Sequence, residues 1–128
     1  MISRLRSWGP ALLWAGIIFA LSAQPTLPVS LGSGRDKIAH FLAYSVLGLL
    51  VARALPPRGR LAWLAILLGS LYGASDELHQ HFVPGRSVDV FDWVADSLGA
   101  AAGASIYRFW WSRRHARRGS AQADLLRS

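Results

Sequence analysis

Four long apolar segments, separated by short polar connections, constrain the fold of this chain more than any other feature. They cover residues 8–23, 38–55, 61–75 and 90–111. A helix of about 20 apolar residues spans the hydrocarbon core of a bilayer. With 128 residues, 52% of them hydrophobic and 16% charged, the chain is too small to hide these segments in a soluble core. We therefore expect an all-α polytopic membrane protein, in which residues 1–128 form one small bundle of four transmembrane helices.

Arginine is distributed unevenly over the ends and connections of these segments. Basic residues gather before the first segment, between the second and third, and after the fourth: Arg4, Arg6, Arg53, Arg58, Arg60, Arg108, Arg113, Arg114, Arg117 and Arg118. The other two connections hold only Arg35, Lys37 and Arg86. Because cytoplasmic loops are enriched in Lys and Arg, both termini are predicted to lie on the cytoplasmic side of the membrane.

The net charge of +7 has two further interpretations. Nucleic-acid binding is disfavoured, because the basic residues follow the segment ends and form no single patch. The basic cytoplasmic tail, residues 112–128, acts as an orientation signal or lies on anionic lipid headgroups.

The first apolar segment also has two interpretations. Basic residues precede it, and Ala20-Leu21-Ser22-Ala23 offers small residues for cleavage, so residues 8–23 are either a retained span or a signal peptide. The remaining chain keeps the same orientation in both cases. The chain has no cysteine, which excludes disulfides, thiolate catalysis and thiolate metal sites.

Ionisable side chains gather at the outer ends of the second, third and fourth segments. Helical spacings of three, four or seven residues place them on one face of each segment. The faces carry Asp36, His40 and Tyr44; Tyr72, Asp76, Glu77 and Gln80; and Asp89, Asp92 and Asp96. Because polar faces turned toward lipid are costly, these three should face one another around a hydrated pocket.

Asp96 is the most deeply placed of these groups. It lies six residues after Val90, or roughly 9 Å along a helix. A carboxylate at that depth needs a partner, and Arg86 and His40 are the candidates.

Other polar residues have a simpler interpretation. Asp36, Lys37 and Asp89 lie near the segment boundaries, where charged side chains commonly reach toward water. His79 and His81 are expected in a loop or at the interface. These five residues therefore need no functional role to explain them.

Two GxxxG patterns indicate where the helices approach closely. Gly69 and Gly73 form one, and Gly99 and Gly103 form the other within an alanine-rich stretch. Small residues at this spacing let helix backbones meet in a membrane. A homo-oligomer, if one forms, is predicted to use the same glycines.

The polar motifs resemble those of a known family. Residues 36–44, Asp-Lys-Ile-Ala-His-Phe-Leu-Ala-Tyr, look like the DKxxHFxxY opening of VanZ-like membrane proteins. Residues 72–86 and 92–99 are similar to its second signature, YGxxDExxQxFxPGR followed by DxxxN/DxxG. The resemblance covers residues 37–103, and at its last polar position this chain has Asp96 where many members carry Asn.

The resemblance has functional implications. The family is named for a member associated with resistance to the glycopeptide antibiotic teicoplanin. Wider comparisons suggest that its members are similar to membrane enzymes that exchange or remove headgroups on lipid phosphates. The resemblance thus implies an active site that faces the exterior.

Phosphodiester chemistry assigns roles to these side chains. His40 would act as general base or nucleophile, oriented by Asp92 or Asp96, and Arg86 would hold phosphate oxygens bidentately. Glu77 and Asp76 would act as acid or base or bind a divalent cation. The candidate catalytic residues are His40, Glu77, Arg86, Asp92 and Asp96, and the candidate substrate-binding residues are Lys37, Tyr44, Tyr72, Asp76 and Gln80. No zinc site is predicted, because His40, His79 and His81 do not share a helix face.

Three functions follow as hypotheses. The first is an enzyme, a headgroup transferase or phosphodiesterase, that acts on membrane lipids or lipid-linked cell-envelope precursors. The second is a non-catalytic module that binds a lipid headgroup or glycopeptide and affects antibiotic susceptibility. The third, a small oligomeric transporter, is disfavoured because the inner halves of the segments are apolar.

Overall fold

The protein is a bundle of four helices. The computed structural model describes residues 2–25, 33–56 and 62–125, which contain α-helices and no strands. The helices are α1 (Ile2–Ser22), α2 (Ser33–Ala54), α3 (Ala62–Gln80) and α4 (Val90–Leu125). The predicted all-α fold with four helices is confirmed. The connection between the second and third segments, which holds Arg58 and Arg60, lies outside the described residues.

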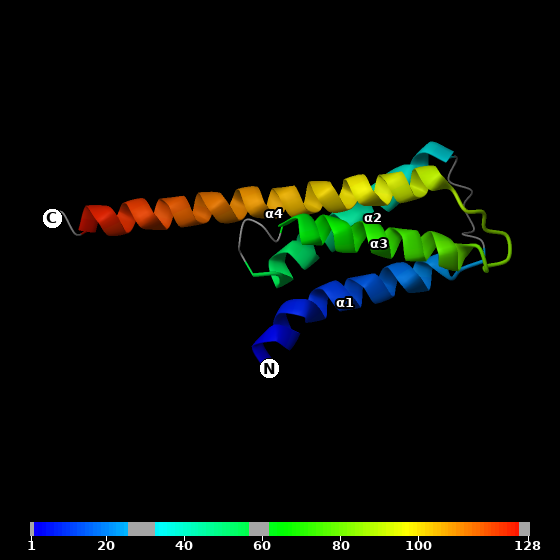
Figure 1. Ribbon diagram of the computed structural model, residues 1–128, viewed down its shortest axis with the longest axis horizontal. Coiled ribbons are helices and arrows are strands. Elements are labelled where there is room, and N and C mark those ends of the chain that lie inside the picture. Colours follow the sequence, from blue (N-terminus) through cyan, green and yellow to red (C-terminus); the bar gives the residue numbers. More distant parts are fainter. Residues whose placement is uncertain (1, 26–32, 57–61, 126–128) are drawn as a thin grey trace.

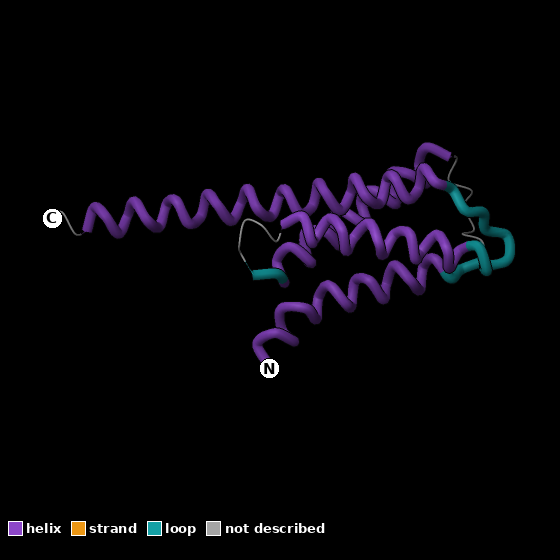
Figure 2. The backbone as a smooth tube through the Cα atoms, in the orientation of Figure 1, coloured by secondary structure: helices purple, strands orange, loops and turns teal. Residues whose placement is uncertain are grey.

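Successive helices run in opposite directions. Figure 1 shows that α1 and α3 end at the same end of the bundle at which α2 and α4 begin, and that both termini lie toward the other end. Figure 2 shows loop segments at both ends of the packed helices. All the polar faces predicted on α2, α3 and α4 therefore belong to one end of the molecule.

Glycines bring α2 and α4 into close contact. A Cβ atom added at Gly99 would collide with the backbone of Phe41, and one added at Gly103 would collide with that of Ser45. Gly48 of α2 meets the backbone of Ala100 in the same way. This pair of helices shares the most extensive contact in the bundle, as the predicted role of small residues requires.

The second glycine pair packs α3 on α4. A Cβ at Gly69 would lie 2.5 Å from Cβ of Ala100, and one at Gly73 would lie 2.9 Å from Cβ of Asp96. Both GxxxG faces are thus filled within a single chain. A homo-oligomer through the same glycines stays a prediction, and it would have to displace these contacts.

Helix α1 is attached by two long-range hydrogen bonds as well as by apolar packing. The Trp14 indole donates to the carbonyl of Ala43 at 2.9 Å, and the Tyr72 hydroxyl donates to the carbonyl of Ala15 at 2.7 Å. The buried apolar cluster consists of Ala11, Ile18, Tyr44, Leu47, Val51, Ala52, Ala65 and Ala104. Apart from Tyr44 its side chains are small or aliphatic, so the helices can pack closely.

The outer surface of the bundle is rich in large apolar side chains. Leu13 is 68% exposed, Trp63 57% and Ile106 59%, each on a different helix. Among the described residues, one helical stretch, residues 34–54, is long and apolar enough to cross a membrane by length and composition, and the apolar stretch Ser7–Ser22 is shorter. The remaining predicted spans, and the orientation of the termini, stay predictions.

Helix α4 continues well past the predicted end of the fourth segment. The basic tail was predicted to begin at residue 112, yet α4 remains helical to Leu125 and projects beyond the other helices (Figure 1). The guanidinium of Arg113 lies 4.2 Å from the ring of Phe109, and that of Arg114 lies 3.5 Å from the ring of Trp110. In each contact the arginine lies about one helical turn after its aromatic partner, so the basic extension is connected to the aromatic residues before it.

Candidate functional site

The predicted polar faces meet at the end of the bundle where α2 and α4 begin. Five polar or charged residues there are nearly inaccessible to solvent: Asp76, Glu77, Gln80, Asp92 and Asp96. They come from α3 and α4, and His40 of α2 lies against them. Buried ionisable groups need partners, so the hydrogen bonds among these residues define the site.

His40 and Asp96 form the central pair. Nδ1 of His40 lies 2.9 Å from Oδ1 of Asp96, and the two side chains are 11% and 0% exposed. Gly73 makes this possible, because a side chain at that position would meet the carboxylate of Asp96. Of the two partners predicted for Asp96, the structure shows His40 and not Arg86.

Lys37 joins the start of α2 to the start of α4. Its ammonium lies 2.5 Å from Oδ2 of Asp89 and 2.9 Å from Oδ1 of Asp92. The hydrogen bond from Lys37 lowers the pKa of Asp89 below its usual value. Asp89 also caps α4, since its Oδ1 accepts the backbone N–H of Phe91 at 2.8 Å. Lys37 and Asp89 thus have charged partners within the protein in addition to partial exposure, which their interpretation as boundary residues did not include.

A chain of hydrogen bonds connects α1 to Arg86. Ser22 donates to Oδ2 of Asp76 at 2.8 Å, and the amide of Gln80 donates to the same oxygen at 3.1 Å. Arg86 donates to the Gln80 oxygen from Nε and Nη2, at 3.2 and 2.6 Å. Gly85, with a φ of 81°, supplies the left-handed turn just before Arg86.

Glu77 connects α3 to the N-terminus of α4. One of its oxygens, Oε2, accepts the backbone N–H of Asp89 at 2.9 Å. The other oxygen, Oε1, is buried and has no hydrogen-bond partner in the structure. Oδ1 of Asp76, Oδ2 of Asp96 and the hydroxyl of Tyr44 share that property. Each of the three carboxylates, Asp76, Glu77 and Asp96, thus has one oxygen hydrogen-bonded within the protein and one buried oxygen without a hydrogen-bond partner.

A pocket of about 160 Å³ lies beside these groups. Its polar lining is Ser22, Asp36, His40, Tyr44, Asp76 and Arg86, and its apolar lining is Ile18, Leu21, Ala39 and Ala43. Helix α1 supplies Ile18, Leu21 and Ser22, although no polar face was predicted on that segment. Tyr72, predicted to position substrate, uses its hydroxyl to hold α1 at Ala15.

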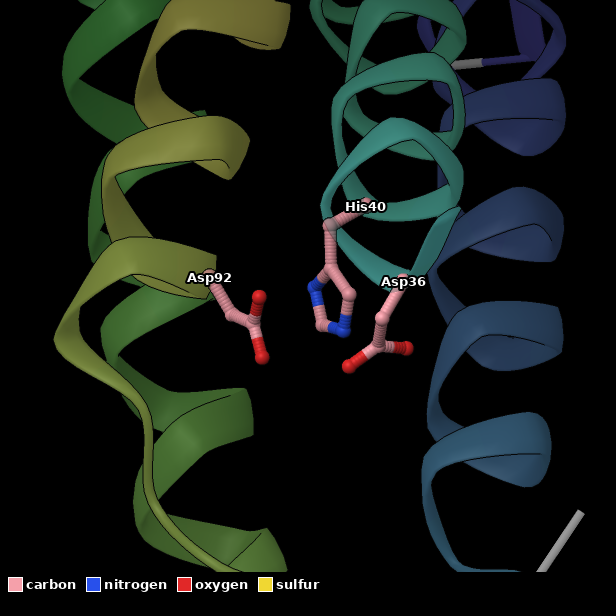
Figure 3. Close-up of side chains that lie close together, drawn as sticks. All are labelled: Asp36, His40 and Asp92. Atoms are coloured by element: carbon pink, nitrogen blue, oxygen red, sulfur yellow. The ribbon is translucent and has the colours of Figure 1, made fainter. Parts of the chain in front are cut away.

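Two groups of side chains have the composition of a metal site. In each, one potential ligand atom per residue lies within 4.8 Å of the others: Asp36, His40 and Asp92 in the first, and His40, Glu77 and Asp96 in the second. Figure 3 shows the ring of His40 between the carboxylates of Asp36 and Asp92. Neither group was predicted as a metal site, because the divalent cation was predicted at Glu77 and Asp76, and the three histidines at positions 40, 79 and 81 do not share a helix face.

The other histidines lie apart from this centre. The ring of His79 stacks on Phe19 of α1, with centroids 4.5 Å apart, and the ring of His81 meets the edge of Phe82 at 5.3 Å. His79 belongs to the last turn of α3 and not to a loop, whereas His81 follows the helix; a position of either residue at the membrane interface stays a prediction.

Sequence reasoning missed Ser22 and undervalued Asp36. Ser22 was assigned to a cleavage pattern, and Asp36 to the boundary of the second segment. The position of Asp36 four residues before His40 was the available signal, because that spacing places both on one helix face. Ser22 offered none, since its partner Asp76 is 54 residues away.

Comparison with known proteins supports the resemblance found in the motifs. The family model described as VanZ/LLP1 matches residues 7–111, so the chain belongs to this family. The matched residues include most of α1, all of α2 and α3, and the part of α4 before its basic extension. No curated protein and no solved structure matches the chain significantly.

Proposed function

Taking membership of the VanZ/LLP1 family as the premise, we propose that the chain is a four-span integral protein of a bacterial cell-envelope membrane. In this proposal it acts on phosphate headgroups of membrane lipids or of lipid-linked envelope precursors. The pocket faces the outer side of the cytoplasmic membrane, and both termini lie in the cytoplasm.

The distribution of polarity supports a membrane location. Large apolar side chains such as Leu12, Leu98 and Phe91 are more than half exposed, while Glu77 and Asp96 are buried. A soluble protein of this size rarely exposes so much contiguous apolar surface. Lipid on the outside and a sheltered polar centre on the inside account for both observations.

The composition of the pocket is the observation that carries the lipid proposal. Its lining combines apolar side chains, such as Ile18, Leu21 and Ala43, with His40, Asp76 and Arg86. A molecule with a polar headgroup joined to an apolar chain matches such a lining. A free, fully polar metabolite would leave the apolar part of the pocket without a matching surface.

The side chains around the pocket suit phosphate chemistry. Gln80 holds the Arg86 guanidinium through Nε and Nη2, and a guanidinium has five N–H donors, so others are available to bind phosphate oxygens. The pair of His40 with Asp96 and the carboxylate of Glu77 supply groups that accept protons or hold a charged cofactor. Exchange or removal of a phosphate headgroup needs a group that binds the phosphate oxygens and a group that transfers protons.

A lipid comparison tests this proposal. Cells that express the wild-type protein, His40→Ala or Glu77→Gln would be compared with cells lacking the gene, by mass spectrometry of phospholipids and undecaprenyl-linked species. We expect a headgroup species that shifts with the wild type and with neither variant. Val94→Ala is the matched control, because Val94 lies on the outward face of α4 near Asp96 and is exposed. Identical lipid profiles in all these strains would reject the chemistry and favour the alternative.

That alternative is a non-catalytic lipid- or glycopeptide-binding module that affects antibiotic susceptibility. The salt bridges from Lys37 to Asp89 and Asp92 favour it, since they already neutralise charge within the protein. A binder would lose affinity gradually as pocket residues change, whereas an enzyme would lose turnover with a single substitution.

A further inference from the structure

We infer that His40, Glu77 and Asp96 form a binding site for a divalent cation. The inference deepens the proposed function, and it rests on that function only for the role of the ion in lipid chemistry. Binding of the ion follows from geometry, burial and charge.

The spacing of the three side chains fits a common ion. One ligand atom from each lies within 4.8 Å of the others, and each residue comes from a different helix. Around an ion with bonds of about 2.1 Å, neighbouring ligands are about 3 Å apart and opposite ligands about 4.2 Å apart. The widest pair has to close by at most about 0.6 Å.

Two buried oxygens of this group lack a partner. Oε1 of Glu77 and Oδ2 of Asp96 have none in the structure, although the residues are only 5% and 0% exposed. Their other oxygens are fixed, Oε2 of Glu77 by the backbone N–H of Asp89 and Oδ1 of Asp96 by His40. A cation between them would satisfy both free oxygens without moving either anchored one.

The second group, Asp36, His40 and Asp92, is a poorer site. The ammonium of Lys37 lies 2.9 Å from Asp92, where it neutralises that carboxylate and would repel an ion. Because Asp36 and Asp92 flank the ring of His40 (Figure 3), they are placed to support its orientation. Carboxylates commonly support metal-bound histidines in this way.

The charge around the pocket calls for an additional cation if the substrate is a phosphate. Six acidic side chains surround the site: Asp36, Asp76, Glu77, Asp89, Asp92 and Asp96. Lys37 and Arg86 supply two positive charges, and Lys37 is already paired with two of the carboxylates. A divalent ion would reduce the repulsion of an anionic headgroup and polarise its oxygens.

The ligand atoms select the kind of ion. One imidazole nitrogen with two carboxylate oxygens, and no sulfur in reach because the chain has no cysteine, suits Mn²⁺ or Zn²⁺. In the presence of the ion, His40 and Glu77 act as ligands, and their replacement abolishes turnover through loss of the ion.

Binding of Mn²⁺ tests the inference directly. Full-length protein in lipid nanodiscs, freed of metal with a chelator, would be titrated with Mn²⁺ while the electron paramagnetic resonance signal of the free ion is recorded. We expect one Mn²⁺ per chain, displaced by Zn²⁺. Glu77→Gln and Asp96→Asn should each weaken binding tenfold or more. Both are isosteric, so Gln can still accept the N–H of Asp89 and Asn can still bond His40, and circular dichroism would check the fold.

Asp36→Asn removes a carboxylate from the second group alone, so it should weaken binding less than Glu77→Gln does. Val94→Ala, at an exposed position of α4, is the matched control and should change the affinity less than threefold. Loss of binding in Asp36→Asn with normal binding in Glu77→Gln would overturn the assignment, as would absence of any bound Mn²⁺. One Mn²⁺ bound per chain in nanodiscs, together with an unchanged lipid profile of the cells, would support the ion site and reject the lipid chemistry. A changed lipid profile, together with no Mn²⁺ bound to the purified protein, would support the lipid chemistry and reject the ion site.

Discussion

Replacement of Gly69 by alanine tests how tightly α3 packs on α4. The new Cβ would lie 2.5 Å from Cβ of Ala100, whereas ordinary contacts at this position lie at 3.4–4 Å. The two helices must therefore separate by about 1 Å, because neither methyl group can rotate away. Overpacking of this kind costs about 1–3 kcal/mol, and the gain in helix propensity offsets at most about 1 kcal/mol. We expect a net loss of about 1–2 kcal/mol in the free energy of unfolding.

The measurement is denaturant unfolding in mixed detergent micelles, followed by circular dichroism. Gly16→Ala is the matched control, since nothing lies within 4 Å of a Cβ at that glycine, and it should leave stability unchanged or raise it. The double variant Gly69→Ala with Ala100→Gly restores the space, so its loss should be smaller than the sum of the single losses. Additive losses, or a Gly69→Ala protein as stable as Gly16→Ala, would refute the packing of α3 on α4.

Three further predictions address the site and the topology. Arg86→Lys keeps the positive charge but loses the contact of two guanidinium nitrogens with Gln80, so it should lower turnover more than tenfold. Wild-type turnover of the variant in a lipid assay would show that Arg86 does not bind the phosphate. Because the pKa of Asp89 is lowered in the folded protein, its salt bridge to Lys37 stabilises the fold fully above the usual pKa near 3.8 and is lost as the pH falls below that value. The wild type should therefore begin to lose stability near that pH, and Lys37→Met should lack this part of the acid transition. Identical acid-unfolding profiles of the two proteins would contradict the prediction. A reporter fused after Arg118 should be active in the cytoplasm, and an external signal would reverse the proposed orientation.

The meeting of His40 with Asp96 could be anticipated from the sequence. Regular helical spacing fixes which residues share a face, and the cost of turning carboxylates toward lipid requires those faces to meet. The pair is 56 residues apart in the chain, yet both members lie on polar faces that were predicted to meet at one end of the bundle. Depth alone could not decide between His40 and Arg86 as the partner of Asp96.

Features that depend on α1 could not be predicted in this way. Its sequence is apolar on all sides, so no face distinguishes the contacts of Trp14 with Ala43 or of Ala15 with Tyr72. Ser22 lies in the pocket only because α1 ends level with Asp76. The neighbouring helices determine which face of a uniformly apolar helix turns toward the bundle, so that face cannot be predicted from the sequence of the helix itself.

The packing of the bundle and the geometry of the site depend on the same residues. Gly73 makes room for the Asp96 side chain, and Gly99 lies against the backbone of Phe41, the residue after His40. The close approach of α2, α3 and α4 therefore sets the separation of the imidazole and the carboxylates. A bundle held apart by larger side chains would keep all its charged residues but spread them too widely to share one proton or one ion. The glycines belong to the site as much as the groups that carry the charge.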